Sequence, residues 1–424
     1  MSERTLGIEQ NALDVAALRS RFPALSRRVD GAPCIYADAP GGTQVPDTVV
    51  EAMTDYLARR NANSGGAFVT SEETDSTIAA ARRAGAALLG CMPDEVVFGA
   101  NMTTLAFALS RSLARKLSPG DEVVVTVLDH DANVSPWVAA AEDAGARVRW
   151  VDIDARDCTL DLDRLEEVLS ERTRIVAFTV ASNAVGTVTP AAEVVRRARR
   201  TEAVVIADAV HLAPHRAIDV RALGVDVLLC SPYKFFGPHM GVMFGTSELL
   251  QGLRPYKVRP AHDDAPDRWE TGTKNHEALA GLMAAVDYLA EVGGAPTGSG
   301  AQRAAVAAGM NAIRRAEATL THAFLDRIAV LDRVQLYGIA DPARCDERTP
   351  TFALRTGDVS PREAAERLGR AGIFTWDGNY YALALMERLG LEESGGALRI
   401  GFCHLNTLEE VERVAAEVAQ LIQR

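Results

Sequence analysis

The sequence lacks the features that would place it in a membrane, on a nucleic acid or in a secretory pathway. No apolar run is long enough to cross a bilayer, and residues 1–7 have neither the basic nor the apolar region of a signal peptide. The chain carries 45 basic against 57 acidic residues, whereas a nucleic acid or an anionic membrane would require clustered positive charge. These absences predict a cytoplasmic protein with neither of those partners.

Cysteine is scarce, and its spacing suggests no pairing. The six cysteines form no CxxC motif and no spacing typical of metal ligands, which disfavours both a bound metal and a disulfide framework. We expect reduced thiols, most of them in the core. They are Cys34, Cys91, Cys158, Cys230, Cys345 and Cys403.

The chain has ample material for a large core. It contains 424 residues, of which 48% are hydrophobic, so it is too long for one simple core. This length predicts two domains, or one large α/β domain with a smaller satellite. Residues 293–300 are rich in small residues and proline, as in a linker or loop beside a domain boundary. A long helix is predicted after them, over residues 304–330.

Short apolar runs alternate with segments of helical periodicity between residues 122 and 245. This alternation predicts a mostly parallel sheet that is covered on both faces and has its ligand site at the strand ends. The predicted strands are residues 122–128, 148–153, 175–180, 204–208, 225–230 and 241–245. The predicted helices are residues 47–60, 76–89, 105–117, 137–144, 161–170 and 191–199.

Two charged residues stand at the ends of apolar runs in this predicted sheet. Asp208 ends the run 204–208, and Lys234 follows the run 225–230 in a loop rich in glycine and proline. Taken singly, they could be a strand-end cap and a surface lysine. Together they match the needs of pyridoxal phosphate (PLP), an aldehyde that a lysine amine holds covalently. A buried carboxylate keeps its pyridine nitrogen protonated.

Other segments could bind the rest of such a cofactor. Residues 100–104 open a helix, where free N–H groups and threonine hydroxyls attract phosphate, although Thr103 could equally be a plain N-cap. His130 follows a strand and could lie over the pyridine ring, or be a polar loop residue. Asn183 and His211 could bond the phenolic oxygen, or serve as a turn residue and a capping or core histidine.

In their order, these motifs resemble those of the class V aminotransferase family of PLP enzymes, nearest to its cysteine desulfurase-like proteins. The resemblance spans roughly residues 34–422. Tyr233 stands where the family usually has a phosphate-binding histidine. The matching segments are residues 39–44 (APGGTQ), 102–104 (MTT), 129–133 (DHDAN), 182–187 (SNAVGT), 208–211 (DAVH), 231–234 (SPYK), 269–273 (WETGT) and 398–407 (LRIGFCHLNT).

The resemblance implies the α/β architecture called PLP fold type I. Its large domain has a mostly parallel seven-stranded sheet flanked by helices, and a smaller α+β domain follows at the C-terminus. In this chain it implies an N-terminal segment 1–34 that joins the small domain, a PLP-binding domain 35–295 and a small domain 296–424. It also implies a homodimer with shared active sites, in which the partner subunit contributes the loop of Thr273 to the phosphate.

The resemblance also assigns roles to single residues. Lys234, Asp208, His130 and Tyr381 are the implied catalytic residues. Arg399 is implied to bind the α-carboxylate of an amino-acid substrate, a bidentate task that suits a planar guanidinium. Further implied substrate contacts are Asn183, Trp376, Tyr380 and Tyr381. The implied PLP-binding residues are Met102, Thr103, Thr104, His130, Asn183, Asp208, His211, Ser231, Tyr233, Lys234 and Thr273.

One departure from the family pattern bears on the reaction. Related desulfurases carry a nucleophilic cysteine shortly before the carboxylate-binding arginine, but Tyr381 stands there, and no cysteine occurs between residues 346 and 402. A phenol cannot accept sulfur as a persulfide. We therefore expect a C–S lyase that acts by β-elimination on cysteine or an S-substituted cysteine. Tyr380 or Tyr381 could protonate the departing sulfur or simply pack.

Other outcomes stay open at this point. The same residues would serve an aminotransferase, a decarboxylating deaminase or an epimerase of the family. A desulfurase that uses a distant thiol such as Cys403 is a weaker alternative, as is a catalytically silent scaffold for sulfur relay. The intact Lys234, Asp208 and Arg399 argue against the silent scaffold.

Overall fold

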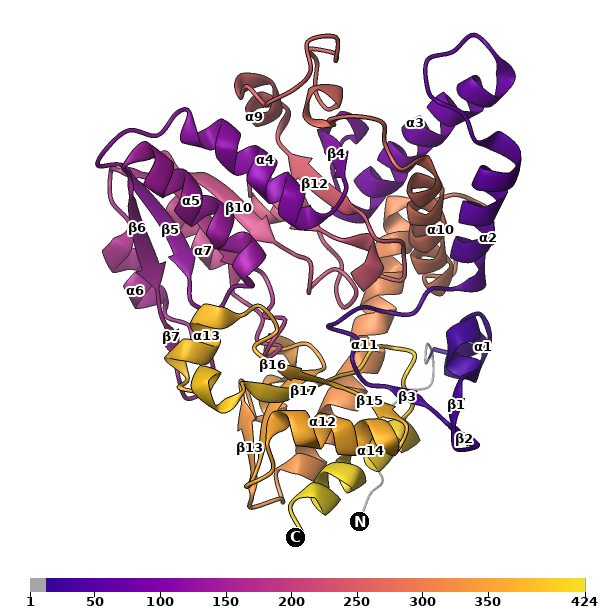
Figure 1. Cartoon of the computed structure of the whole chain (residues 1–424), viewed down its shortest axis with the longest axis vertical. Helices are drawn as coiled ribbons and strands as arrows, with labels where there is room; N and C mark the ends of the chain where they lie inside the picture. Colours follow the sequence, from indigo (N-terminus) through magenta and orange to yellow (C-terminus); the bar gives the residue numbers. More distant parts are fainter. Residues whose placement is uncertain (1–12, 424) are drawn as a thin grey trace, which may run out of the picture.

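A seven-stranded sheet forms the centre of the larger part of the molecule (Figure 1). The computed structural model describes residues 13–423. Only β12 runs antiparallel to its neighbours, so the sheet is mostly parallel, as predicted. In spatial order the strands are β4 (Val96–Gly99), β12 (Gly241–Gly245), β11 (Val227–Cys230), β10 (Val204–Asp208), β9 (Thr173–Thr179), β5 (Glu122–Thr126) and β6 (Arg147–Val151).

Helices cover both faces of this sheet (Figure 1). None of the helices in residues 13–423 has the length and apolar character that a membrane span requires. The helices of this part are α2 (Asp47–Asp55), α3 (Val69–Leu89), α4 (Met102–Ala114), α5 (Ser135–Ala144), α6 (Leu162–Val168), α7 (Ala191–Ala198), α8 (Val220–Leu223), α9 (Ser247–Gly252) and α10 (His276–Val292).

The sheet is buried on both sides because successive side chains of a strand point to opposite faces. Val123 and Val125 of β5 lie in one core, with apolar residues of α4 and α5. Val124, between them, lies in the opposite core, with apolar residues of α3, α7 and α10. The carboxyl ends of the central strands are thereby held between two packed layers.

Most predicted elements lie within a few residues of their predicted bounds. β10 and β12 begin and end as predicted, whereas the predicted strand 148–153 divides into β6 and a separate β7 (Ile153–Asp154). The sequence patterns missed β4 and α10. β4 has only four residues. α10 is buried on most of its surface, so it lacks the apolar stripe by which a surface helix is recognised.

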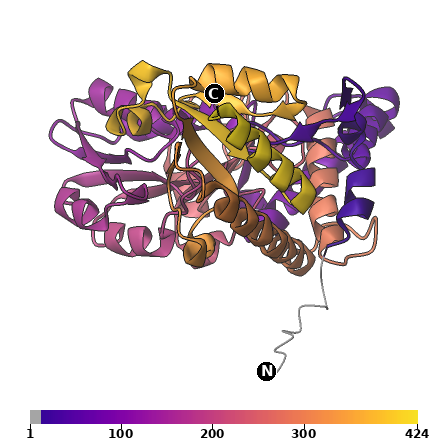
Figure 2. The same ribbon diagram turned by 90° about the horizontal axis from the view of Figure 1, so that it is seen from below.

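A second, four-stranded sheet forms the smaller part of the molecule, seen from below in Figure 2. Its apolar face packs against three helices around Phe324, Phe352 and Phe402. The strands, in spatial order, are β13 (Val334–Tyr337), β14 (Thr351–Thr356), β17 (Ala397–Gly401) and β16 (Trp376–Gly378). The helices are α11 (Arg303–Ile328), α12 (Pro361–Arg370) and α14 (Leu408–Leu421).

The N-terminal part of the chain contacts this smaller part. Residues 1–12 of the predicted segment 1–34 lie outside the described residues. In α1 (Val15–Ser20), Arg19 donates to the Leu405 carbonyl at 2.6 Å and pairs with Glu410 at 2.8 Å. Strand β3 (Ile35–Tyr36) pairs in parallel with β15 (Ile373–Phe374). The domain boundaries themselves remain a prediction.

Candidate active site

A cavity of about 290 Å³ lies at the carboxyl ends of β9, β10 and β11. All the site residues predicted from the sequence line it, except Thr104 and Thr273. Parallel strands bring the segments that follow them to one edge of the sheet, which is why motifs distant in sequence converge there. This position is the one predicted for the ligand site.

Lys234 and Asp208 face the same cavity from neighbouring strands. Lys234 ends a single 3₁₀ turn after β11, and its Nζ donates to the carbonyl of Pro40. Burial and the nearby Arg399 lower the pKa of Lys234 to about 7. Burial raises the pKa of Asp208 to about 6, and its Oδ1 accepts the Val210 N–H at 2.8 Å.

His130 presents a neutral imidazole to the cavity. Its Nδ1 accepts the Ala132 N–H at 3.0 Å, so the ring proton is assigned to Nε2. Burial and the charge of Lys234 lower the pKa of His130 to about 4. The ring of Tyr381 stacks on the imidazole with centroids 5.4 Å apart and an interplanar angle of 19°.

Asn183 and His211 are both oriented by residues of the smaller part. The Asn183 Nδ2 donates to the Tyr380 carbonyl at 2.9 Å, which leaves Oδ1 buried without a partner among the described residues. The His211 Nε2 lies 3.1 Å from the hydroxyls of both Thr349 and Thr351. Burial holds the pKa of His211 well below its ordinary value. His211 is therefore a neutral ring tied to β14 on one side.

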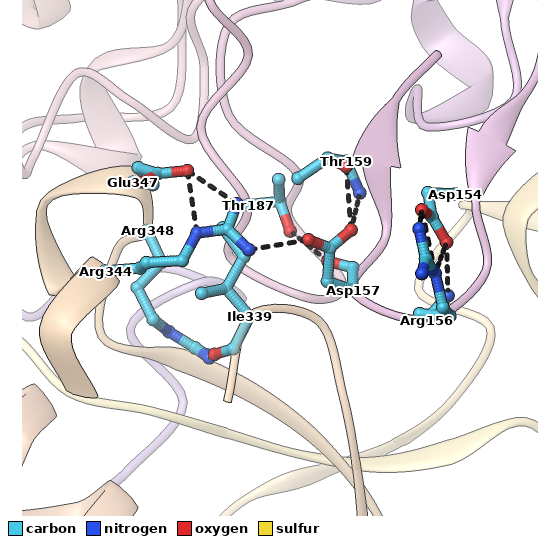
Figure 3. Close-up of polar contacts among 9 residues, drawn as sticks. All are labelled: Asp154, Arg156, Asp157, Thr159, Thr187, Ile339, Arg344, Glu347 and Arg348. Carbon is cyan, nitrogen blue, oxygen red and sulfur yellow. Dashed lines mark hydrogen bonds and ion pairs between the residues drawn. The ribbon is translucent and has the colours of Figure 1, made fainter. Parts of the chain in front are cut away.

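The segment before β14, whose Arg344, Glu347 and Arg348 are labelled in Figure 3, contacts the loop that follows Asn183. The Thr349 N–H donates to the Gly186 carbonyl at 2.8 Å, and the buried Arg348 donates to carbonyls of residues 185, 339 and 351. Burial lowers the pKa of Arg348 to about 9. Arg344 pairs with Asp157 at 2.7 Å and with Glu347, and so links the segment before β14 to the larger part of the molecule (Figure 3).

The residues predicted to hold the phosphate lie in the first turn of α4. Met102 and Thr103 line the cavity. Thr104 instead bonds to the cap residue, because its N–H donates to the Asn101 Oδ1 at 2.8 Å and its hydroxyl donates to the Asn101 carbonyl. β12 passes so close to this turn that a Cβ at Gly241 would overlap the Asn101 carbonyl. The N-cap of α4, for which the sequence suggested Thr103, is therefore Asn101.

Thr273 lies outside the cavity, in an exposed loop between α9 and α10. With Thr104 it lines a separate hollow of about 470 Å³. The base of the loop is fixed, because Arg82 of α3 makes two contacts to Glu270, at 2.8 and 2.9 Å. Lys274 adds a third contact to Glu270 at 2.9 Å. The loop thus projects from a rigid base; its role in a partner's site stays a prediction.

Ser231 and Tyr233 lie directly before Lys234 and line the cavity. Tyr233 replaces the histidine of the family pattern, and its ring stacks on His239 with centroids 4.8 Å apart. The Lys234 Nζ lies 4.7 Å from the centre of the Tyr233 ring. Burial raises the pKa of Tyr233, which keeps it a neutral hydrogen-bonding group.

Arg399 reaches the cavity from β17 of the smaller sheet. Its side chain is 4% exposed, and its Nη2 lies 2.9 Å from the Asp38 Oδ1. Its Nη1 donates to the Asn183 carbonyl at 3.2 Å, while Nε is buried without a partner among the described residues. The guanidinium carbon lies 4.5 Å from the centre of the Tyr380 ring. These contacts fix the plane of the guanidinium.

Strand β16 and the loop after it bring Trp376, Tyr380 and Tyr381 to the cavity. Tyr380 is buried, and its hydroxyl donates to the Ala397 carbonyl. This bond leaves Tyr380 poorly placed to protonate a departing sulfur, one of the two uses considered for it. Trp376 and Tyr381 are 56% and 73% exposed at the mouth.

Several lining groups were not predicted. Pro40 and Gly41 line the cavity and belong to the segment 39–44, which resembles a family motif. The glycine pair of that segment was the sequence signal that could have identified them. Asp38 lies outside the lining but pairs with Arg399 across 361 positions of sequence, and it had no signal of its own. Pairing of the N-terminal segment with the smaller part of the molecule brings it next to Arg399.

The cavity provides the groups that PLP requires. Lys234 offers an amine to an aldehyde, Asp208 a buried carboxylate to a pyridine nitrogen, and α4 a helix N-terminus to a phosphate. Two buried polar atoms in its wall, Asn183 Oδ1 and Arg399 Nε, have no hydrogen-bond partner within residues 13–423, as expected where a polar ligand binds. The residues therefore fit the cofactor.

Known proteins share this sequence pattern and this fold. Residues 35–414 match the model of the class V aminotransferase family. The chain is 31% identical over 423 residues to a cysteine desulfurase of Synechococcus elongatus. The matched region covers 96% of this chain but only 64% of that protein, less than two thirds of its length. It is also 31% identical over 399 residues to a probable cysteine desulfurase of Streptomyces coelicolor, covering 89% and 91% of the two chains.

Solved structures agree with the fold. A cysteine desulfurase of Thermococcus onnurineus NA1 superimposes with a TM-score of 0.87 at 24% identity, covering 98% of this chain and 99% of the other. A cysteine desulfurase of Escherichia coli superimposes with a TM-score of 0.82 at 26% identity, covering 97% and 99%.

The chain belongs to the class V aminotransferase family. Within it, the protein is a PLP-dependent enzyme with the large mostly parallel sheet of its relatives. The predicted cofactor and fold class are thereby confirmed.

Proposed function

We propose that this enzyme cleaves the C–S bond of cysteine or an S-substituted cysteine by β-elimination. One observation carries the proposal: among the described residues that line the cavity none is a cysteine, and the loop before Arg399 presents Tyr381 instead. Cys403, the thiol next along the chain, is buried outside the cavity, and burial raises its pKa to about 12. Such a thiol is a poor nucleophile.

The residues have distinct tasks in this reaction. When bound, PLP supplies an electron-withdrawing ring that stabilises negative charge at Cα of the substrate. Arg399 binds the α-carboxylate and so orients the Cα–H bond. Lys234, with its pKa near 7, takes the Cα proton because its neutral amine is well populated at neutral pH. Asp208 would lie opposite the pyridine nitrogen as its counter-charge.

Cleavage then breaks the bond between Cβ and sulfur. The electron pair leaves with the sulfur, which takes up a proton and departs as a thiol or as sulfide. The remaining three-carbon fragment hydrolyses in water to pyruvate and ammonia. Tyr381 is the hydroxyl at the cavity mouth that could deliver the proton to sulfur, since the Tyr380 hydroxyl is bonded to Ala397.

We also propose a homodimer with shared sites. Thr273 lies outside the cavity of its own chain, on a loop with a rigid base, and the family pattern assigns that loop to the phosphate of the partner subunit. The exposed position of the loop in the single chain supports this arrangement.

The reaction is tested by product analysis of the PLP-loaded enzyme with S-methylcysteine. We expect pyruvate and methanethiol in equal amounts, no added sulfur on the protein by mass spectrometry, and no product from Lys234→Ala. A protein-bound persulfide after incubation with cysteine would show desulfuration. A cofactor that recovers only with a keto acid would show aminotransfer. Carbon dioxide release, or inversion at Cα, would show decarboxylation or epimerisation.

A further inference from the structure

The cavity is divided into a polar interior and an aromatic mouth. Asp208, Lys234 and Arg399 line its wall, and the side chains of Asp208 and Arg399 are buried. Trp376 and Tyr381 line the same cavity but are 56% and 73% exposed, so their rings stand where the cavity opens to solvent. Exposed aromatic surface at a pocket mouth is typical of a site for an apolar ligand group.

The backbone that carries Tyr381 is strained. The Ala382 N–H donates to the Asn379 carbonyl at 2.8 Å and closes a four-residue turn. Its two central residues, Tyr380 and Tyr381, have φ of 57° and 59°. Positive φ at both central positions defines a turn that normally uses asparagine and glycine, because bulky side chains are disfavoured there. The two tyrosines therefore conflict with the backbone conformation that the turn imposes on them.

Bonds to the site residues maintain this conformation. The Tyr380 carbonyl accepts the Asn183 amide at 2.9 Å, and the Tyr381 carbonyl accepts the Asp131 N–H at 2.7 Å. In this turn the Tyr380 ring packs against Arg399 in the interior, and the Tyr381 ring lies at the mouth, stacked on His130. Strain that the surroundings maintain at a ligand cavity points to a function for the strained residues.

Resting on the proposed function, we infer that Trp376 and Tyr381 form an aromatic clamp for the group carried by the substrate sulfur. The preferred substrate is then a cysteine whose sulfur bears an aromatic or extended apolar substituent. Arg399 binds the carboxylate end in the buried part, and the mouth offers aromatic faces to the other end. An aromatic substituent gains both burial and ring contacts there, which a methyl group or a bare thiol cannot.

The test compares S-benzylcysteine with S-methylcysteine on the PLP-loaded enzyme. For each we would measure kcat/KM from pyruvate release and Kd from the change in the visible band of the cofactor. We expect both ratios to favour the benzyl compound about tenfold or more. Tyr381→Ala should lower this preference several-fold, whereas Tyr381→Phe, which keeps the ring, should retain it. Tyr256→Ala removes an exposed aromatic residue outside the cavity and should leave it unchanged.

The results that would contradict the aromatic clamp differ from those that would contradict the lyase reaction. Equal kcat/KM and Kd for the two compounds, or a benzyl preference that survives Tyr381→Ala, would overturn the clamp while pyruvate release leaves the lyase intact. Loss of the preference in Tyr381→Phe would also overturn it, because the hydroxyl rather than the ring would then be recognised. If neither compound gives pyruvate, the lyase proposal fails, and a Kd preference that depends on the Tyr381 ring would still support the clamp.

Discussion

At the scale of single residues, the amine of Lys234 titrates far below the range of an ordinary lysine. Its pKa is lowered to about 7 by burial and by Arg399, so raising the pH through 7 converts the ammonium to the neutral amine. Only the neutral amine attacks an aldehyde. We predict that the rate of PLP uptake by the cofactor-free protein rises about tenfold from pH 6 to pH 8 and then levels off. Stopped-flow recording of the visible band measures this rate.

The attachment point is checked separately. Borohydride reduction of the loaded enzyme, followed by peptide mapping, should place the pyridoxyl group on Lys234. Lys234→Ala should remain folded but give no reduced adduct. An adduct on Lys257 or Lys274 instead would contradict the assignment, as would an uptake rate that does not vary between pH 6 and pH 8.

As proposed above, Asp208 would supply the charge opposite the pyridine nitrogen. Asp208→Asn keeps the shape of the side chain but removes the charge, so we predict that PLP still binds while kcat falls by about 100-fold or more. Exchange of the Cα proton in deuterated water, followed by NMR, isolates the proton-transfer step. Near-normal exchange in this variant would move the role to another group.

At the scale of elements, the strained turn links function to stability. A non-glycine residue in the left-handed region costs about 1–2 kcal/mol, and glycine there costs about 0.5–1 kcal/mol in unfolded-chain entropy. Because Tyr381 is largely exposed, little burial is lost on its removal. We predict that Tyr381→Gly raises the free energy of unfolding by up to about 1 kcal/mol, measured by urea denaturation. Tyr381→Phe is the control and should show no gain; a less stable glycine variant would contradict the strain.

The contact between α3 and the Thr273 loop is a buried ion pair. Arg82 and Glu270 are both buried, and breaking such a pair costs about 3–5 kcal/mol. Because Lys274 stays as a partner of Glu270, we expect the lower end of this range, about 3 kcal/mol. We predict a loss of this size for Arg82→Met, with faster hydrogen exchange across residues 271–273. Arg196→Met, at an exposed pair with Glu193, is the matched control and should be close to neutral. Similar stability of the two variants would show that the loop base is not held by this pair.

At the scale of the whole molecule, shared sites predict complementation between inactive variants. Lys234→Ala and Thr273→Ala damage different sites if Thr273 acts in the partner subunit. Random mixing of the two should restore about one quarter of wild-type activity, because half of the dimers are mixed and each has one intact site. Dissociation and reassociation of the two purified variants, followed by an activity assay, provides the measurement. No recovery, or a fully loaded stable monomer by ultracentrifugation, would exclude shared sites.

The central sheet was predictable because its information is local. Apolar runs such as residues 204–208 form buried parallel strands, and the groups that follow them, including Lys234 and His130, are delivered to one edge of the sheet by that topology alone. The four-residue β4 and the almost wholly buried α10 were missed, since neither presents a clear apolar period.

The sequence by itself determined the cofactor, the order of the site residues and the absence of a thiol between residues 346 and 402. Only the tertiary structure decided what surrounds them. The pairing of Asp38 with Arg399, and the stacking of Tyr381 on His130, join residues far apart in the chain. The first contact follows from the pairing of the N-terminal segment with the smaller part of the molecule, where Asp38 lies beside β17. The second follows from the docking of the smaller part against the larger one. No local pattern of residues encodes either arrangement.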